Sequence, residues 1–213
     1  MSAVAGDFYD FLPVDEKRLG VLVADVTGHG IPAALIASML KVAFASQASH
    51  ASDPARVLSG LNRALCGKFE EHFVTAAYLF VDLENRLLRY SAAGHPPLMM
   101  AIRAQPNVRE IQENGLMLGL FQEASYSCVE IPVGPGDRCL LYTDGVLEAS
   151  NIAREEFGKS RCKEFLQSRR SIPAADFAEQ LLVSVAAFSG CNSGRPQEDD
   201  ITLLVLDFHH DAP

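Results

Sequence analysis

Several patterns that would mark other classes of protein are missing from this chain. The five cysteines are scattered, odd in number and never spaced as CxxC, which argues against a disulfide framework or a zinc site and favours a reducing cytosol. The most apolar stretch, residues 31–45, contains Lys41 and is too short to span a bilayer. No basic and apolar leader precedes Asp7. We therefore expect a cytoplasmic protein with no membrane span in this segment.

Basic residues are also scarce. The chain has 18 Lys and Arg against 27 Asp and Glu, a net charge of −9, which argues against nucleic acid or an anionic membrane as the main partner. Its 213 residues, 48% apolar and 21% charged, suit a globular protein, and no repeat or linker divides them. We predict a single domain over residues 1–213. Because a strand pattern begins almost at the first residue, we expect this domain to be the C-terminal part of a longer regulatory protein.

The hydrophobic periodicity predicts a mixture of strands and helices. Adjacent strands with short connections indicate antiparallel sheet, and helices kept apart from the strands indicate an α+β fold rather than a doubly wound one. Asp53 or Ser52 is expected to cap the second helix, whose apolar face is Val57, Leu58, Leu61 and Leu65. The predicted strands are 4–14, 19–26, 74–82, 86–93, 98–104, 108–112, 125–133, 137–145 and 201–208, and the predicted helices are 31–48, 54–69 and a broken pair within 159–190.

Four acids lie at the ends of apolar strand patterns rather than on solvated surfaces. They are Asp7 in AGDFYD, Asp25 in ADVTGHG, Asp144 in LLYTDG and Asp199 in DDITLLVL. Carboxylates in such places need a cation or hydrogen-bond donors, and few Lys or Arg residues lie beside them. If the strand ends converge, an oxygen-only ligand set favours Mg²⁺ or Mn²⁺, and this many carboxylates suit a two-metal centre that activates water against phosphorus.

Each of these acids taken singly also has a simpler interpretation. Asp-Gly is a common turn pair, so any one of the four could be an ordinary turn residue. Four acids in matching contexts are harder to explain in this way, although their spacing alone does not establish that they converge. Gly28 and Gly30 could suggest a phosphate-binding loop, but turn geometry around a ligand Asp explains them better.

Six segments in order resemble one protein family. They are AGDFYD, ADVTGHGIPAAL, FVTAAYLFVDLENRLLRYSAAGHPPL, GLMLGL, LLYTDGVLEA and DDITLLVL, which extend over nearly the whole chain. Together they resemble the SpoIIE/RsbU-type branch of the metal-dependent PPM, or 2C-class, protein serine/threonine phosphatases. The resemblance implies an α-β-β-α sandwich, in which two antiparallel sheets are packed together and flanked by helix pairs.

The resemblance also implies the chemistry. Two Mn²⁺ or Mg²⁺ ions would be bound by Asp7, Asp25, Asp144 and Asp199 and by the carbonyl group of Val26. Asp25 and Asp144 are the residues on which hydrolysis should depend most directly. Asp200 is expected to support the site from behind, and Asp10 either orients the site or is a turn acid at the strand exit. Where the family has GGD this chain has Ala5-Gly6-Asp7, a change that is tolerated unless Ala5 needs a positive φ.

The resemblance further implies the biological setting. The expected substrate is a phosphorylated STAS-type anti-anti-sigma regulator in bacterial partner switching. The expected partners are an N-terminal sensor or receiver domain, which would act through the helices after Asp25, and a second copy in a homodimer. The alternative is a non-catalytic module with the PPM fold that only binds a regulator. Loss of a ligand Asp would favour that alternative, and all four are present.

The histidines are less informative. His29 could donate a proton to the leaving serine oxygen, but a role in stabilising the turn explains it equally well, so the general acid stays unassigned. His95 lies near the place where relatives of another branch carry an acid for a third metal, and it is expected to pack within a loop instead. His209 and His210 lie in a polar tail and are expected to be solvated.

Overall fold

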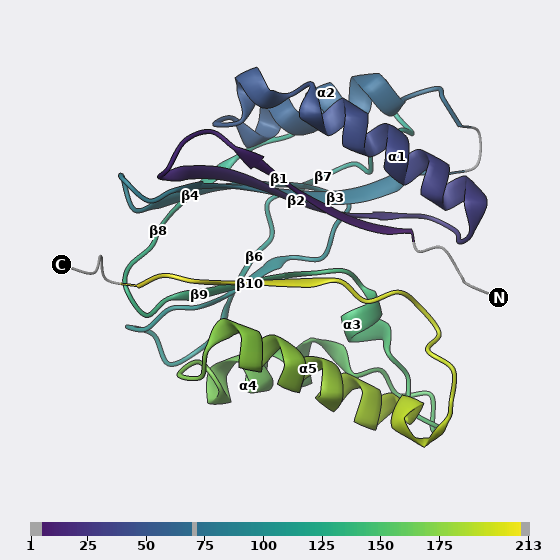
Figure 1. Ribbon diagram of the computed structural model, residues 1–213, viewed down its shortest axis with the longest axis vertical. Helices are drawn as coiled ribbons and strands as arrows, with labels where there is room; N and C mark the ends of the chain where they lie inside the picture. Colours follow the sequence, from purple (N-terminus) through teal and green to yellow (C-terminus); the bar gives the residue numbers. More distant parts are fainter. Residues whose placement is uncertain (1–5, 70–71, 210–213) are drawn as a thin grey trace. The chain divides into compact units, whose positions relative to one another are not determined.

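The structure is a computed structural model that describes residues 6–69 and 72–209. Two compact units divide the chain: the first comprises Met1–Pro97 and Gln112–Pro132, and the second comprises Leu98–Ile111 and Val133–Pro213. Each unit is a sheet with a pair of helices on one face (Figure 1). The predicted α+β class is confirmed, and each unit has the two layers expected of one half of the sandwich.

The first unit is built on a sheet in the order β1-β2-β3-β4-β7, with β8 also pairing with β4. Its long strands are antiparallel neighbours, and among the described strand pairs of this sheet only β4–β7 is parallel. Short turns join β1 to β2 and β3 to β4, whereas residues 27–73 separate β2 from β3. Strands β1 and β2 form a hairpin around Asp15–Arg18, between the predicted strands 4–14 and 19–26. The strands are β1 (Asp7–Pro13), β2 (Arg18–Val26), β3 (Val74–Asp82), β4 (Leu87–Ala93), β7 (Asn114–Gly115) and β8 (Val129–Pro132).

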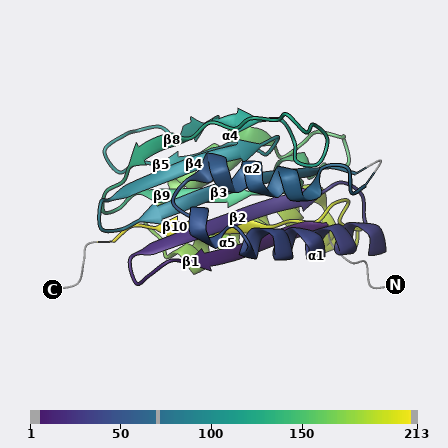
Figure 2. The same cartoon turned by 90° about the horizontal axis from the view of Figure 1, so that it is seen from above.

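Two helices cover one face of this sheet. Helix α1 (Ile31–Ala45) lies over β1 and β2, and α2 (Pro54–Leu65) lies over β3 and β4 (Figure 2). A short 3₁₀ turn, Ala48–His50, precedes α2. Asp53 caps α2 as predicted, since its Oδ1 accepts a hydrogen bond from the Arg56 amide at 3.1 Å. All four residues of the predicted apolar face of α2 are buried in the core of this unit.

The second unit is built on an antiparallel sheet in the order β10-β9-β5-β6. Helices α4 and α5 cover one face of it, and their aromatic side chains meet edge to face, as Phe165 and Phe177 do with ring centroids 5.4 Å apart. The elements are β5 (Leu98–Ala101), β6 (Arg109–Ile111), β9 (Arg138–Tyr142), β10 (Leu203–Asp207), α3 (Gly145–Glu148), α4 (Gly158–Ser168), α5 (Ala174–Ser189) and a 3₁₀ turn, Cys191–Ser193.

One arginine is buried between this sheet and its helices. Arg138 is only 2% exposed, and its Nε and Nη2 lie 2.5 and 2.7 Å from the carboxylate oxygens of Asp207. Its remaining donors reach the carbonyl groups of Arg169 and Ile172, and its guanidinium lies 4.8 Å from the centroid of the Phe177 ring. This pairing makes burial of the charge tolerable, because each of the three guanidinium nitrogens donates to an acceptor and the group lies over an aromatic ring.

Several predicted boundaries are wrong. The predicted strand 98–104 ends at Ala101, the predicted strand 125–133 shrinks to β8, and the predicted helix 54–69 ends at Leu65. Strand β10, at the edge of its sheet, is half-buried along its length. The short helix α3, which begins where the strand 137–145 was expected to continue, was not predicted. The predicted start of the first strand at Val4 lies outside the described residues.

Candidate metal site

In the first unit, two of the predicted ligands are cross-strand neighbours. Strands β1 and β2 pair so that the Cα of Asp7 lies opposite the Cα of Asp25, and the Val26 amide donates to the Gly6 carbonyl at 3.2 Å. Directly opposite residues of an antiparallel pair point to the same face of the sheet, and like charges there repel one another. Both residues are half-buried. Asp7 is the first residue of β1, whereas the predicted strand 4–14 had placed it inside the strand.

Gly6 allows the backbone to approach this pair closely. A Cβ at this position would lie 2.5 Å from the carbonyl oxygen of Val26 and 3.3 Å from Asp25 Oδ1. Only glycine therefore fits between the two predicted ligand groups. Ala5, whose backbone conformation was in question, lies outside the described residues.

The turn after Asp25 is held by contacts from a distant segment. The Thr27 amide and hydroxyl both donate to the Phe73 carbonyl at 3.1 Å, and the Phe73 amide donates to the Thr27 hydroxyl at 2.9 Å. Gly28 and Gly30 have φ values of 90° and 78°, a region that favours glycine. These bonds fix the turn on both sides of the peptide that carries the Val26 carbonyl.

His72 was not identified from the sequence, yet it takes part in this turn. Its Nδ1 lies 2.8 Å from the Thr27 carbonyl oxygen, so Nδ1 carries the proton that this bond requires. A Cβ added to Gly28 would lie 3.2 Å from the His72 ring, which leaves little room for any other residue there. His29 is exposed on the same turn, where its role as a general acid stays a prediction.

In the second unit, Asp144 and Asp199 follow and precede two paired strands. Thr143, just after β9, donates from its amide to the Thr202 carbonyl at 3.0 Å, and the Thr202 amide donates back to the Thr143 hydroxyl at 2.9 Å. Any side chain on Gly145 would overlap the carbonyl oxygen of Asp200. These contacts hold the TDG turn and the Asp-Asp pair against each other.

Several acids lie near one another around Asp144 and Asp199, and their charges repel. Partial burial raises the pKa of Asp199, and the charges of Asp144 and Asp200 raise it further, although the Asp200 amide donates to Asp199 Oδ1 at 2.8 Å. Burial also raises the pKa of Glu148, with further contributions from Asp144, Glu156 and Asp199. A bound cation would relieve this repulsion, so the surroundings of Asp199 suit a metal ligand.

The donor set has the chemistry of a magnesium or manganese site, since all five predicted ligand atoms are oxygens. Among residues 6–69 and 72–209, however, no group of three or more His, Cys, Asp or Glu side chains that could hold a metal ion is found. Within the units the four acids come in pairs: Asp7 with Asp25 in the first, and Asp144 with Asp199 in the second. Their convergence on shared ions stays a prediction.

Other polar residues singled out in the sequence have structural roles. His95 is buried in the first unit with its Nδ1 2.9 Å from the Thr75 hydroxyl, so it packs within the fold as expected. Asp10 lies inside β1 rather than at a strand exit, and it accepts a hydrogen bond from Lys41 of α1 at 2.9 Å. His209 is exposed, and His210 lies outside the described residues.

None of the helices in the described part of the chain is long and apolar enough to cross a membrane. Residues 15–209 match the family described as Stage II sporulation protein E (SpoIIE).

The chain is 30% identical to phosphoserine phosphatase RsbP of Bacillus subtilis over 191 residues, which cover 86% of this chain and 45% of that protein. It is 32% identical to phosphoserine phosphatase RsbU of the same organism over 207 residues, covering 95% of this chain and 59% of that one. It thus spans about half the length of these relatives.

A solved structure of the SiaA-PP2C domain of Pseudomonas aeruginosa aligns with a TM-score of 0.85 and 26% identity, covering 96% of this chain and 81% of that one. This likeness extends to both sheets and their helix pairs, because nearly the whole chain is aligned. With a family match that covers all but the two ends, the chain belongs to the SpoIIE family.

Proposed function

We propose that this chain is a Mn²⁺- or Mg²⁺-dependent protein phosphatase domain that acts on phosphoserine and phosphothreonine. The observation that carries the proposal is that four acids stand beside strand ends, two in each unit, in a chain of this family. Each pair brings like charges together, and each is held by backbone contacts that leave little freedom. Such an arrangement is costly unless a cation is to be bound.

Two ions would be held by Asp7, Asp25, Asp144, Asp199 and the Val26 carbonyl. When bound, they would supply an activated water and neutralise the charge that develops on the phosphoryl group. The protein's own contribution is to hold its oxygens rigidly: Gly6 and the Thr27–Phe73 bonds do so in the first unit, and the Thr143–Thr202 bonds do so in the second. His29 is the candidate for the general acid.

The proposed substrate is a phosphoserine-bearing STAS-type regulator in bacterial partner switching, and the proposed compartment is the cytoplasm. Support for phosphoserine comes from RsbP and RsbU, both of which are phosphoserine phosphatases by name. Comparing phosphate release from a phosphorylated STAS protein with release from nucleotides tests the substrate class. Faster release from nucleotides would favour a hydrolase of small phosphoesters instead.

The metal site is tested by removing one ligand from each unit. Asp25→Ala and Asp144→Ala should each abolish Mn²⁺-dependent hydrolysis of p-nitrophenyl phosphate, because each loses an oxygen that binds the ions. Asp15→Ala is the matched control, since Asp15 is an exposed turn acid paired with Arg18 at the far end of the β1–β2 hairpin. Circular dichroism checks that all three variants keep the fold.

Unchanged turnover in either ligand variant would contradict the proposal. A wild-type protein that releases no phosphate with or without Mn²⁺ would favour the alternative, a non-catalytic module that binds a regulator. The presence of all four acids speaks against that alternative.

We also propose that the chain works as part of a longer protein with an N-terminal sensor or receiver domain, and as a homodimer. The lengths of RsbP and RsbU support the first point, because the matched region is only 45% and 59% of those proteins. The reading frame of the full gene tests the sensor, and light scattering of the full-length protein tests the dimer.

A further inference from the structure

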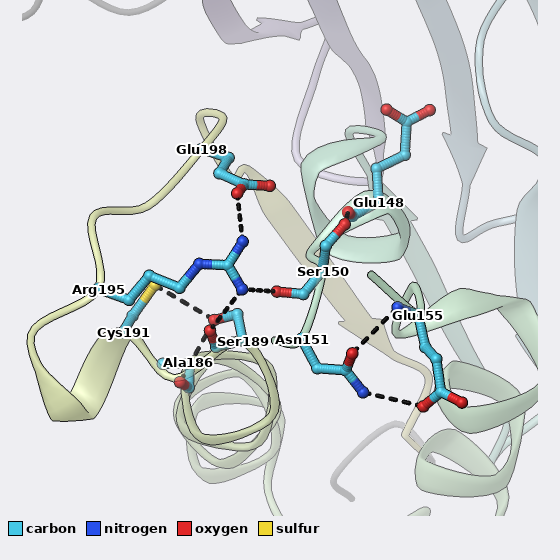
Figure 3. Close-up of polar contacts among 9 residues, drawn as sticks. All are labelled: Glu148, Ser150, Asn151, Glu155, Ala186, Ser189, Cys191, Arg195 and Glu198. Carbon is cyan, nitrogen blue, oxygen red and sulfur yellow. Dashed lines mark hydrogen bonds and ion pairs between the residues drawn. The ribbon is translucent and has the colours of Figure 1, made fainter. Parts of the chain in front are cut away.

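One arginine, Arg195, joins three separate segments of the second unit (Figure 3). Nη1 of Arg195 donates to the carbonyl groups of Ser150 at 2.8 Å and Ser189 at 3.4 Å. Its Nη2 lies 2.5 Å from Glu198 Oε1. Ser150 follows α3, Ser189 is the last residue of α5, and Glu198 immediately precedes the proposed ligand Asp199.

These bonds occupy both terminal nitrogens of the guanidinium. Arg195 is therefore already bound to three acceptors of the protein itself. The bond to the Ser189 carbonyl is favourable in its own right, because a cation at the C-terminus of a helix meets unpaired carbonyl groups and the negative end of the dipole. We call this group of contacts the Arg195 clasp.

Polar contacts also hold the first part of the loop, residues 190–200: the Gly194 amide donates to the Cys191 carbonyl at 3.0 Å, and the Arg195 amide donates to the Gly190 carbonyl at 3.4 Å. The loop leaves α5 at Gly190, whose φ of 81° ends the helix, and it borders a pocket of about 650 Å³ whose lining includes Gly145, Glu148, Leu182 and Asp199. On the side of the pocket, the loop faces open space. Its position consequently depends on polar contacts.

Within the loop, further hydrogen bonds pass the constraint on to Asp199. The Gln197 side-chain amide donates to the Asp199 carbonyl at 2.6 Å, and the Asp200 amide donates to Asp199 Oδ1 at 2.8 Å. The Arg195 clasp holds Glu198, the residue before Asp199. The bonds from Gln197 and Asp200 hold the carbonyl group and the carboxylate of Asp199 itself.

We propose that Arg195 is a positioning residue, which sets the loop so that Asp199 is presented in the geometry that a metal ion requires. This inference rests on the proposed function, since it takes Asp199 as a ligand. Residues that orient metal ligands typically change metal affinity by about 10- to 100-fold when removed. Arg195→Ala should therefore weaken Mn²⁺ binding by at least about tenfold, while turnover at saturating Mn²⁺ is retained.

The experiment measures Mn²⁺ binding by isothermal titration calorimetry without substrate, together with turnover over a range of Mn²⁺ concentrations and with thermal unfolding. Arg161→Ala is the matched control, because its Nη1 also donates to two carbonyl groups of the second unit, those of Glu156 and Phe157, at 2.9 and 3.2 Å. Arg161 has no hydrogen bond to the 190–200 loop among the described residues. If Arg195→Ala does not fold, Arg195→Lys gives the same comparison, since a lysine lacks the planar fork that spans three acceptors.

The expected result is weaker Mn²⁺ binding in the Arg195 variant and wild-type binding in the Arg161 variant. Equal affinity in wild type and Arg195 variant would overturn the inference, as would equal weakening by Arg161→Ala, because the effect would then be general destabilisation. A wild-type protein that binds no Mn²⁺ would instead overturn the proposed function, and this inference with it.

Discussion

Gly6 shows that the geometry of a site can depend on the absence of a side chain. An alanine side chain would meet the Val26 carbonyl at 2.5 Å, so either the carbonyl or the start of β1 must move. Inserting even a small group into a filled space commonly costs about 1–3 kcal/mol. Since Val26 and Asp25 are both proposed ligands, the same displacement disturbs the metal site.

We expect Gly6→Ala to lower the free energy of unfolding by about 1–3 kcal/mol and to weaken Mn²⁺ binding, as measured by chemical denaturation and calorimetry. Gly134→Ala is the control, because the nearest atom to a Cβ there is Asp137 Oδ2 at 3.8 Å, an ordinary contact. If both variants lose similar amounts of stability and Mn²⁺ affinity, the effect at Gly6 does not come from its close contacts with Val26 and Asp25.

The sequence was enough to single out the acids but not their supports. Asp7, Asp25, Asp144 and Asp199 are recognisable because each interrupts or ends an apolar pattern. His72 and Arg195 carry no such signal, since their partners Thr27 and Ser150 are 45 residues away along the chain. Contacts of that range depend on the tertiary fold, which local patterns do not encode.

At the scale of elements, the buried ion pair between β9 and β10 joins the sheet of the second unit to its helices. Removing one partner of a buried, hydrogen-bonded pair leaves the other charge unpaired and typically costs about 3–5 kcal/mol. Arg138→Ala should destabilise the protein by about this amount, because Asp207 and the carbonyl groups of Arg169 and Ile172 lose their donor.

Urea unfolding at neutral pH measures this loss. Lys163→Ala serves as the comparison, since the ion pair of Lys163 with Glu110 lies in the same unit but is partly exposed and should be worth about 1 kcal/mol or less. If Arg138→Ala lowers the free energy of unfolding no more than Lys163→Ala does, the buried pair contributes little beyond an ordinary surface contact.

Elements with a strong repeating pattern were predictable, and short ones were not. The apolar face and start of α2 and the long strands β3 and β4 are confirmed almost to the residue, although α2 ends at Leu65 rather than at residue 69. Helix α3 and strand β7 have four and two residues, too few to show a period. They exist because the turns after Tyr142 and before Leu116 are held by hydrogen bonds to other segments.

At the scale of the whole molecule, binding of the proposed ions should be linked to folding. A ligand that binds only the folded state stabilises it, by about 2.7 kcal/mol when present at a hundred times its Kd. Mn²⁺ should therefore raise the unfolding temperature of the wild-type protein, and excess EDTA should reverse the rise. Asp144→Ala should melt at the same temperature with and without Mn²⁺.

Differential scanning calorimetry measures these shifts. An unfolding temperature that is independent of Mn²⁺ in the wild type would argue against a metal site that involves the folded state. The prediction of a single domain also bears on this experiment, since one cooperative transition for both units would support it.

The two units are interlaced along the chain, which passes from one to the other after Pro97, Ile111 and Pro132. Strand β8, a partner of β4, is therefore synthesised only after β5 and β6 of the other sheet. During translation, the edge of β4 that pairs with β8 therefore stays unpaired until β8 has been made. Unpaired strand edges make newly synthesised β-proteins prone to incorrect pairing. The first unit cannot be completed on the ribosome before synthesis of the second has begun. We therefore expect stable folding to occur late in translation, after much of both sheets has emerged.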